Sequence, residues 1–167
     1  MLTSHPLVQR ISFTGGTSAA RHVVRNSAEN FAQVSLELGG KSPFIVFDDA
    51  NIESAVNGSI AGIFGASGQS CVAGSRLYLH NSIADEFLDK MLPQAQTIKL
   101  GDPLEDATQM GPLATYAQIE HVERQVAMAK AEGGTILTGG DRGDTPDIGW
   151  YYPVSYTHLT LPTKSSG

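Results

Sequence analysis

Apolar and polar residues follow one another along the chain in a pattern that predicts short strands between longer helices. Short apolar runs that end at glycine or aspartate are typical of strands, whereas apolar residues spaced three and four apart indicate helices. Strands are predicted at residues 8–14, 34–38, 44–47, 76–80 and 135–138. Helices are predicted from Thr17 to about residue 28, from an Asn51 cap through residue 64, from residue 83 to about 98, and over residues 115–132.

Strands that alternate with helices predict an α/β fold with a mainly parallel sheet. The apolar run at residues 44–47 is too short and too continuous for an amphipathic helix. It is interpreted as a strand buried on both faces, as in parallel sheets. Residues 155–167 differ, because they contain three Ser, three Thr, no acidic residue and no periodicity. This tail is predicted to be a non-native or disordered extension.

Composition narrows the class of protein. Of the 167 residues, 41% are hydrophobic and 17% are charged, which is the balance of a globular protein. The net charge of −6 argues against a nucleic-acid partner, since no basic face is available to displace counterions. No apolar run approaches the length that crosses a bilayer, and residues 1–10 lack the features of a secretion signal. One cysteine suits a reducing compartment, so the cytoplasm is expected.

Two glycines separate the first predicted strand from the first predicted helix. Gly15 and Gly16 would let the backbone approach a ligand, and the start of a helix favours phosphate. The full G-x-G-x-x-G pattern is missing, so a simple tight turn is the alternative. The histidines form no zinc pattern, and Asp48-Asp49 is followed by no calcium-loop spacing, so no metal site is predicted.

Cys71 lies among small residues, which include Gly68, Ser70, Ala73 and Gly74. A lone cysteine is usually an inert apolar residue of the interior. A reactive thiol needs thiolate character, access and donors for an oxyanion. The small neighbours permit access and donors, and they leave the thiolate character open.

Glu37 interrupts an otherwise apolar predicted strand just before Gly39-Gly40. Strand alternation places it on the same side as Ser35, so a partly exposed strand edge is one explanation. Buried among apolar neighbours, the carboxyl group would be a usable general base near neutral pH. Spacing alone does not separate these two interpretations.

Taken together, these segments resemble the aldehyde dehydrogenase superfamily. The sequence Phe-Thr-Gly-Gly-Thr at residues 13–17 resembles the family's F-T-G-S motif, and residues 37–41 match its E-L-G-G-K motif completely. Residues 68–76 (GQSCVAGSR) resemble its nucleophile segment, 34 residues after Glu37 (71 − 37 = 34). Further short matches occur in the family's order at residues 101–103, 111–112 and 149–153. The resemblance covers residues 2 to about 154.

The resemblance implies a role for each matching position. Cys71 would be the nucleophile and Glu37 the base that activates water. Gly15, Gly16 and Thr17 would face NAD or NADP, and Leu38 and Gly39 would lie near the nicotinamide. The implied substrate is a small-molecule aldehyde, and the implied parent protein is a homodimer or homotetramer.

The implied fold is a partial aldehyde dehydrogenase. Residues 1–38 would be the C-terminal part of the Rossmann-type dinucleotide-binding domain, and residues 39–154 the N-terminal part of the α/β catalytic domain. Gly16 departs from the family by replacing the usual serine, so one hydroxyl contact to a cofactor phosphate is missing. The family's oxyanion asparagine and cofactor lysine would precede Met1, and its E-x-F-G-P segment would follow Val154. The chain is therefore interpreted as an internal fragment.

Three functions follow as alternatives. The first is a parent enzyme that oxidises an aldehyde to a carboxylic acid through a thioester on Cys71. The second is transfer of the acyl group to CoA, which Glu37 disfavours because that branch generally lacks the base. The third is a non-catalytic piece, since losing one oxyanion donor costs about 10²–10³ in rate. The 167 residues alone are expected to be inactive.

Overall fold

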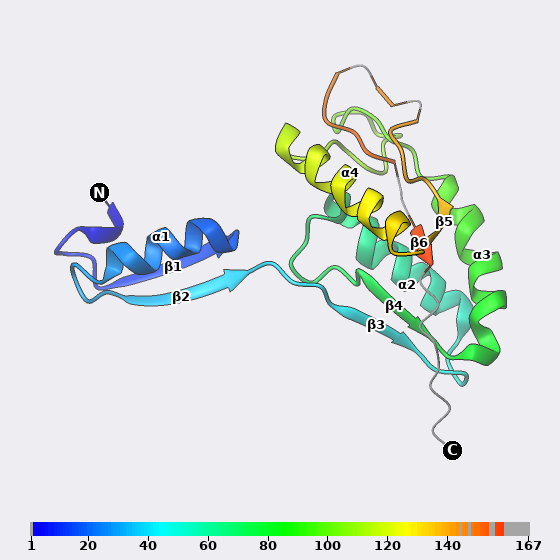
Figure 1. Cartoon of the computed structure of the whole chain (residues 1–167), viewed down its shortest axis with the longest axis horizontal. Helices are drawn as coiled ribbons and strands as arrows, with labels where there is room; N and C mark the ends of the chain where they lie inside the picture. Colours follow the sequence, from blue (N-terminus) through cyan, green and yellow to red (C-terminus); the bar gives the residue numbers. More distant parts are fainter. Residues whose placement is uncertain (1, 144, 147, 154–155, 159–167) are drawn as a thin grey trace.

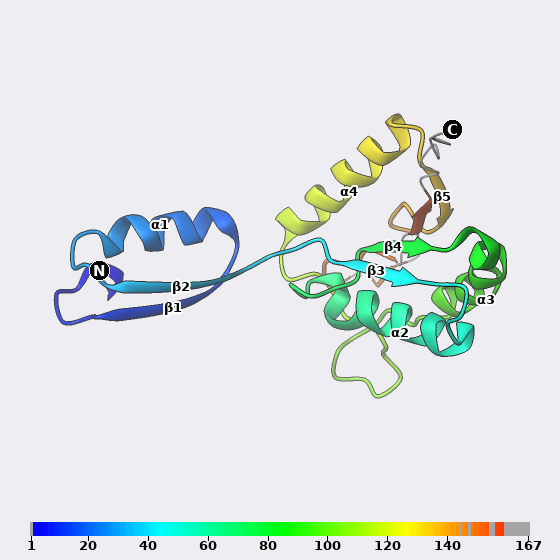
Figure 2. The same ribbon diagram turned by 90° about the horizontal axis from the view of Figure 1, so that it is seen from below.

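The chain folds into a smaller and a larger lobe that are joined by an extended segment (Figure 1). The computed structural model describes residues 2–143, 145–146, 148–153 and 156–158. The extended segment follows β2 and leads into β3, and Figure 2 shows the same separation from a second direction. No helix in the described ranges is long and apolar enough to cross a membrane.

The smaller lobe is one strand–helix–strand unit. After a short 3-10 helix, η1 (Leu2–Ser4), it contains β1 (Arg10–Gly15), α1 (Thr17–Ser27) and β2 (Gln33–Leu38). The two strands are parallel, with Thr14 beside Glu37 and Gly15 beside Leu38. Helix α1 buries Ala20, Val23 and Ser27, which lie three and four residues apart and therefore on one face.

The larger lobe begins with a second strand–helix–strand unit. Strands β3 (Pro43–Val46) and β4 (Arg76–Leu79) are parallel and are connected through α2 (Ile52–Phe64) and the 3-10 helix η2 (Gly65–Gly68). The chain continues through η3 (Asn81–Ile83), α3 (Ala84–Gln96) and α4 (Tyr116–Ala131). Strand β5 (Thr135–Thr138) pairs with β6 (Tyr156–His158) in an antiparallel manner.

The main core lies where α2 and α3 pack on one face of the β3–β4 pair. It consists of Val46, Val56, Ile83, Phe87 and Met91. Alternate residues of the strands, Phe44 and Leu77 among them, complete this layer. Helix α2 starts where the sequence predicts, because the Asn51 side chain accepts a hydrogen bond from the Ser54 amide at 2.9 Å.

The predicted strands and helices agree with the observed elements to within about two residues, apart from β6. The parallel pairing of β1 with β2 and of β3 with β4 confirms the α/β prediction. The prediction that the strand at 44–47 is buried on both faces is wrong. Ile45 is 59% exposed and its neighbour Tyr78 is 41% exposed, because helices α2 and α3 cover only the opposite face.

The structure describes three residues of the predicted tail. Residues Tyr156–His158 form β6, whose backbone pairs with β5. Backbone pairing needs no apolar periodicity, which is why the sequence pattern gave no sign of this strand. Residues 155 and 159–167 of the predicted tail lie outside the described residues. The origin of the tail stays a prediction, as do the domain roles of residues 1–38 and 39–154.

Candidate active site

The carboxyl ends of β1 and β2 form one edge of the smaller lobe. The parallel register puts Gly15 beside Leu38, so the turn into α1 and the start of the extended segment after β2 lie at this same edge. Helix α1 begins there at Thr17, with Gly16 as a cap that supplies no side-chain hydrogen bond. The structure thus brings together all five residues that the sequence associates with a cofactor, namely Gly15, Gly16, Thr17, Leu38 and Gly39.

The start of α1 has the features that a phosphate group needs. A Cβ built on Gly16 would meet no atom within 4 Å, so there is open space beside the backbone. The first turn of α1 carries no acidic side chain that would compete for its amide groups. Free amides and the positive end of the helix dipole favour an anion. These residues fit the phosphates of a dinucleotide.

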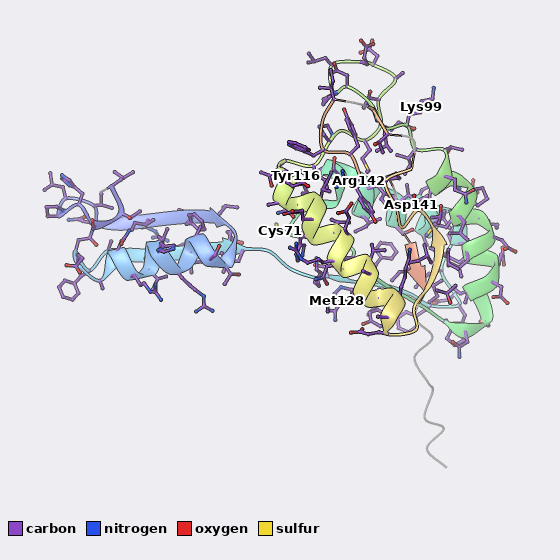
Figure 3. The ribbon with its side chains drawn as sticks, turned by 45° about the horizontal axis from the view of Figure 1, so that its top comes forward. Cys71, Lys99, Tyr116, Met128, Asp141 and Arg142 are labelled. Carbon is purple, nitrogen blue, oxygen red and sulfur yellow. The ribbon has the colours of Figure 1, made fainter. Side chains whose placement is uncertain are left out.

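Cys71 lies in the loop between η2 and β4, on an exposed part of the larger lobe. The thiol is free and exposed, as its small neighbours predict. Figure 3 shows Cys71 on the side of the larger lobe that faces the extended segment and the smaller lobe. The adjacent Val72 is also exposed. A reagent or substrate can therefore reach the sulfur from solvent.

The backbone around Cys71 leaves one donor unused. The amide of Val72 donates to Ser70 Oγ at 3.4 Å, and the amide of Ala73 donates to the Ser70 carbonyl oxygen at 3.2 Å. The Cys71 amide, by contrast, donates to no acceptor among the described residues. A free N–H on the residue that carries the thiol is suited to bind an oxyanion formed next to the sulfur.

The extended segment after β2 runs directly past the Cys71 loop. A Cβ built on Gly40 would lie 3.0 Å from the Cys71 carbonyl oxygen, so glycine permits this close approach. Arg76 fixes the next residues, because its Nε donates to the Lys41 carbonyl at 2.9 Å and its amide donates to the Ser42 carbonyl at 3.2 Å. Residues 40–42, which follow β2 and Glu37 in the sequence, are thereby held beside the Cys71 loop and β4.

Glu37 itself is exposed at the end of β2. Its carboxylate makes no hydrogen bond or ion pair with the described residues. The burial among apolar neighbours that would favour a base is not found, because Glu37 has β1 beside it and no described element covering its side chain. The sequence allowed either a buried base or a partly exposed strand edge, and Glu37 is exposed at a strand edge among the described residues.

Two side chains at the start of the Cys71 loop, those of Ser67 and Gln69, make long-range hydrogen bonds that the sequence did not predict. Ser67 Oγ donates to the Gly111 carbonyl at 2.8 Å, and Gln69 Oε1 accepts from the Ala114 amide at 3.2 Å. Their partners are 44 and 45 residues away in the sequence. A local sequence pattern cannot reveal contacts at that separation. The sequence pointed to a role for these residues only through the presence of Gln69 in the nucleophile segment.

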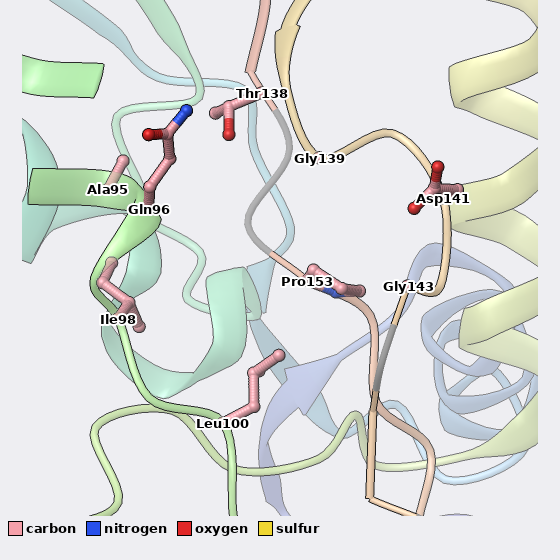
Figure 4. Close-up of a pocket in the computed structure, with 9 residues that line it drawn as sticks. All are labelled: Ala95, Gln96, Ile98, Leu100, Thr138, Gly139, Asp141, Gly143 and Pro153. Carbon is pink, nitrogen blue, oxygen red and sulfur yellow. The ribbon is translucent and has the colours of Figure 1, made fainter. Parts of the chain in front are cut away.

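A cavity of about 290 Å³ lies elsewhere in the larger lobe (Figure 4). Its wall combines residues from the end of α3, the loops around β5 and Pro153. The lining residues are Ala95, Gln96, Ile98, Leu100, Thr138, Gly139, Asp141, Gly143 and Pro153. None of the candidate catalytic or cofactor-binding residues lines it. The candidate site is thus an open surface at Cys71 and the strand edge rather than this cavity.

Comparison with known proteins gives a consistent result. A sequence profile described as the aldehyde dehydrogenase family matches residues 1–159. The chain is 53% identical over 153 residues to the (Z)-2-((N-methylformamido)methylene)-5-hydroxybutyrolactone dehydrogenase of Acinetobacter baylyi, covering 92% of the chain and 31% of that protein.

Solved structures agree with the sequence match. The crystal structure of PnpE with nicotinamide adenine dinucleotide superposes with a TM-score of 0.87 at 43% identity, over 93% of this chain and 32% of that one. A 3,6-anhydro-L-galactose dehydrogenase in complex with NADP has a TM-score of 0.89 at 37% identity, over 95% and 34% of the two chains. The chain spans about a third of the length of the relatives it matches. With a profile that matches most of its residues, the chain belongs to the aldehyde dehydrogenase family.

Proposed function

We propose that the whole protein oxidises an aldehyde to a carboxylic acid with NAD or NADP, and that Cys71 is its nucleophile. The observation that carries this proposal is the combination, on one exposed residue, of a free thiol and an amide that donates to no described acceptor. A nucleophile needs access, and the oxyanion that it generates needs a donor. Cys71 offers both.

The chemistry at Cys71 follows from these groups. The thiolate adds to the aldehyde carbon, and the carbonyl oxygen becomes an oxyanion beside the Cys71 amide. Loss of hydride from that carbon leaves a thioester on the sulfur. When bound, the nicotinamide dinucleotide supplies the hydride acceptor, and Gly15, Gly16, Thr17, Leu38 and Gly39 would hold it at the strand edge.

Glu37 is proposed as the general base of the second half of the reaction. Its carboxylate takes a proton from water, and the resulting hydroxide attacks the thioester carbon and releases Cys71 as thiolate. The proposal is supported by the position of Glu37 at the end of β2, three residues before Gly40, whose backbone approaches the Cys71 carbonyl. Water is thus the proposed acyl acceptor, and the product is a carboxylic acid.

The decisive test uses Cys71→Ser in the full-length protein. The variant is expected to lose aldehyde-dependent NADH or NADPH formation, because a hydroxyl is a far weaker nucleophile than a thiolate. Ser54→Ala is the control, since it changes an exposed side chain of α2 outside the Cys71 loop and leaves the thiol in place. Oxidation at the normal rate by Cys71→Ser would show that another residue is the nucleophile.

Product analysis tests the role of water. Free carboxylic acid is expected with or without added CoA, whereas product that forms only as an acyl-CoA would identify an acyl-transfer enzyme. The purified 167-residue chain is expected to form no NADH from aldehyde.

We also propose the cytoplasm as the compartment, because a single accessible thiol is preserved in reducing surroundings.

A further inference from the structure

Three consecutive residues where the nucleophile segment begins have left-handed backbone conformations. They are Ala66 with φ 51°, Ser67 with φ 55° and Gly68 with φ 72°. Alanine and serine rarely adopt this conformation, because the Cβ atom crowds the backbone oxygen. Such segments persist only where surrounding contacts hold them. The contacts made by residues 66–68 and their neighbours therefore determine the conformation of the Cys71 loop.

Two side chains attach the segment to the chain that precedes α4. Ser67 Oγ donates to the Gly111 carbonyl at 2.8 Å, and Gln69 Oε1 accepts from the Ala114 amide at 3.2 Å. The backbone N–H of Gln69 also closes the left-handed turn by donating to the Ala66 carbonyl oxygen at 3.0 Å. Gln69 thus joins the local turn to a distant segment through separate atoms.

The segment that receives these bonds is itself held in place. Leu113 is buried with Ile119 and Tyr152 in a cluster beneath α4. The Leu113 amide donates to the Trp150 carbonyl at 2.7 Å. The attachment point at Gly111 and Ala114 is therefore part of a packed region rather than a free loop.

We propose that Gln69 is a positioning residue for the Cys71 nucleophile. Its carboxamide holds the loop against the 111–114 segment, and this sets where the thiol and amide of Cys71 lie. The inference rests on the proposed function, in which Cys71 attacks the aldehyde. Gln69 precedes Cys71 by two residues, and Ser70 between them anchors the following turn through its hydroxyl and carbonyl oxygens. A shift of Gln69 is transmitted to Cys71 through this short stretch.

Gln109 provides a matched control. Its Oε1 accepts from the Lys99 amide at 2.9 Å, which is the same kind of bond as the one between Gln69 and Ala114. Figure 3 shows Lys99 at a different part of the larger lobe from Cys71. Gln109→Leu therefore removes an equivalent hydrogen bond to which no residue of the Cys71 loop contributes. Because Gln109 precedes Gly111 by two residues, this variant also tests whether loosening the attachment segment alone lowers kcat.

The experiment compares variants of the full-length protein by steady-state kinetics and urea unfolding. Gln69→Leu is expected to lower kcat by about 100-fold with little change in KM for the aldehyde, as a small misplacement of a catalytic group does. Gln69→Glu is expected to restore most of kcat, because a carboxylate oxygen can accept from the Ala114 amide. Gln109→Leu is expected to keep the normal kcat.

The possible results distinguish failure of the positioning role of Gln69 from failure of the proposed function. Normal kcat in Gln69→Leu, or an equal loss in Gln109→Leu, would overturn the positioning role. If urea unfolding shows that Gln69→Leu is not folded, Ser67→Ala removes the companion bond to Gly111 and is held to the same expectation. Cys71→Ser is measured in parallel: activity in that variant refutes the proposed function, whereas its inactivity beside a fully active Gln69→Leu refutes only the inference about Gln69.

Discussion

Phe87 is the residue whose loss should most clearly destabilise the larger lobe. Its side chain is 0% exposed in α3, within the core cluster that includes Val46 of β3 and Val56 of α2. Phe87→Ala removes the ring from all of these contacts and leaves a cavity. Truncation of a buried phenylalanine costs about 3–5 kcal/mol, a large part of the 5–15 kcal/mol that typically stabilises a folded domain.

Phe31→Ala is the matched control for this truncation. Phe31 is 93% exposed, so the same atoms are removed without loss of burial. Phe31 has φ 55°, and alanine, like phenylalanine, carries the Cβ atom that disfavours this conformation. The backbone cost is therefore similar in the two sequences. A surface change of this type is expected to alter the free energy of unfolding by no more than about 0.5 kcal/mol.

Urea unfolding followed by far-ultraviolet circular dichroism measures both variants. With a urea slope of about 2 kcal/mol per M, a loss of 3–5 kcal/mol lowers the midpoint by about 1.5–2.5 M. The slope is expected to stay the same, because the surface exposed on unfolding changes little. Equal midpoints for Phe87→Ala and Phe31→Ala would refute the assignment of the core to this cluster.

Three further predictions concern the cap of α2, an ion pair on α3 and the proposed base. Asn51→Ala removes the acceptor for the Ser54 amide and should lower the free energy of unfolding by about 1 kcal/mol, whereas an unchanged urea midpoint would mean that the cap is replaceable. The Glu86 carboxylate raises the pKa of Lys90, first through their hydrogen bond of 2.8 Å and then through its charge. This stabilisation is fully present below the ordinary pKa of lysine and is lost as the pH rises through the raised pKa of Lys90. The small difference in the free energy of unfolding between the unaltered chain and Lys90→Gln should therefore vanish at strongly alkaline pH. A difference that grew there would contradict the pairing. Glu37→Gln in the full-length protein should form one equivalent of NADH or NADPH and then stall with an acyl group on Cys71 visible by mass spectrometry, and sustained normal turnover would exclude Glu37 as the base.

The sequence alone determined the elements and the family. Each predicted strand and helix depends on periodicity, capping and glycine placement within a few neighbouring residues, which is why Asn51 could be recognised as a cap before α2. The motifs around Glu37 and Cys71 are also local, so the sequence by itself shows the resemblance to aldehyde dehydrogenases. Small residues around Cys71 likewise predicted an accessible thiol.

Only the tertiary structure decided which faces are covered and what holds the nucleophile loop. Ile45 belongs to an apolar run, yet it is exposed because helices α2 and α3 pack on the other face of β3 and β4. Ser67 adopts a left-handed conformation that its residue type does not favour, and Gln69 bonds to Ala114 across 45 residues. Burial and long-range hydrogen bonds depend on which segments lie side by side in the fold. Local sequence patterns do not specify which distant segments those are.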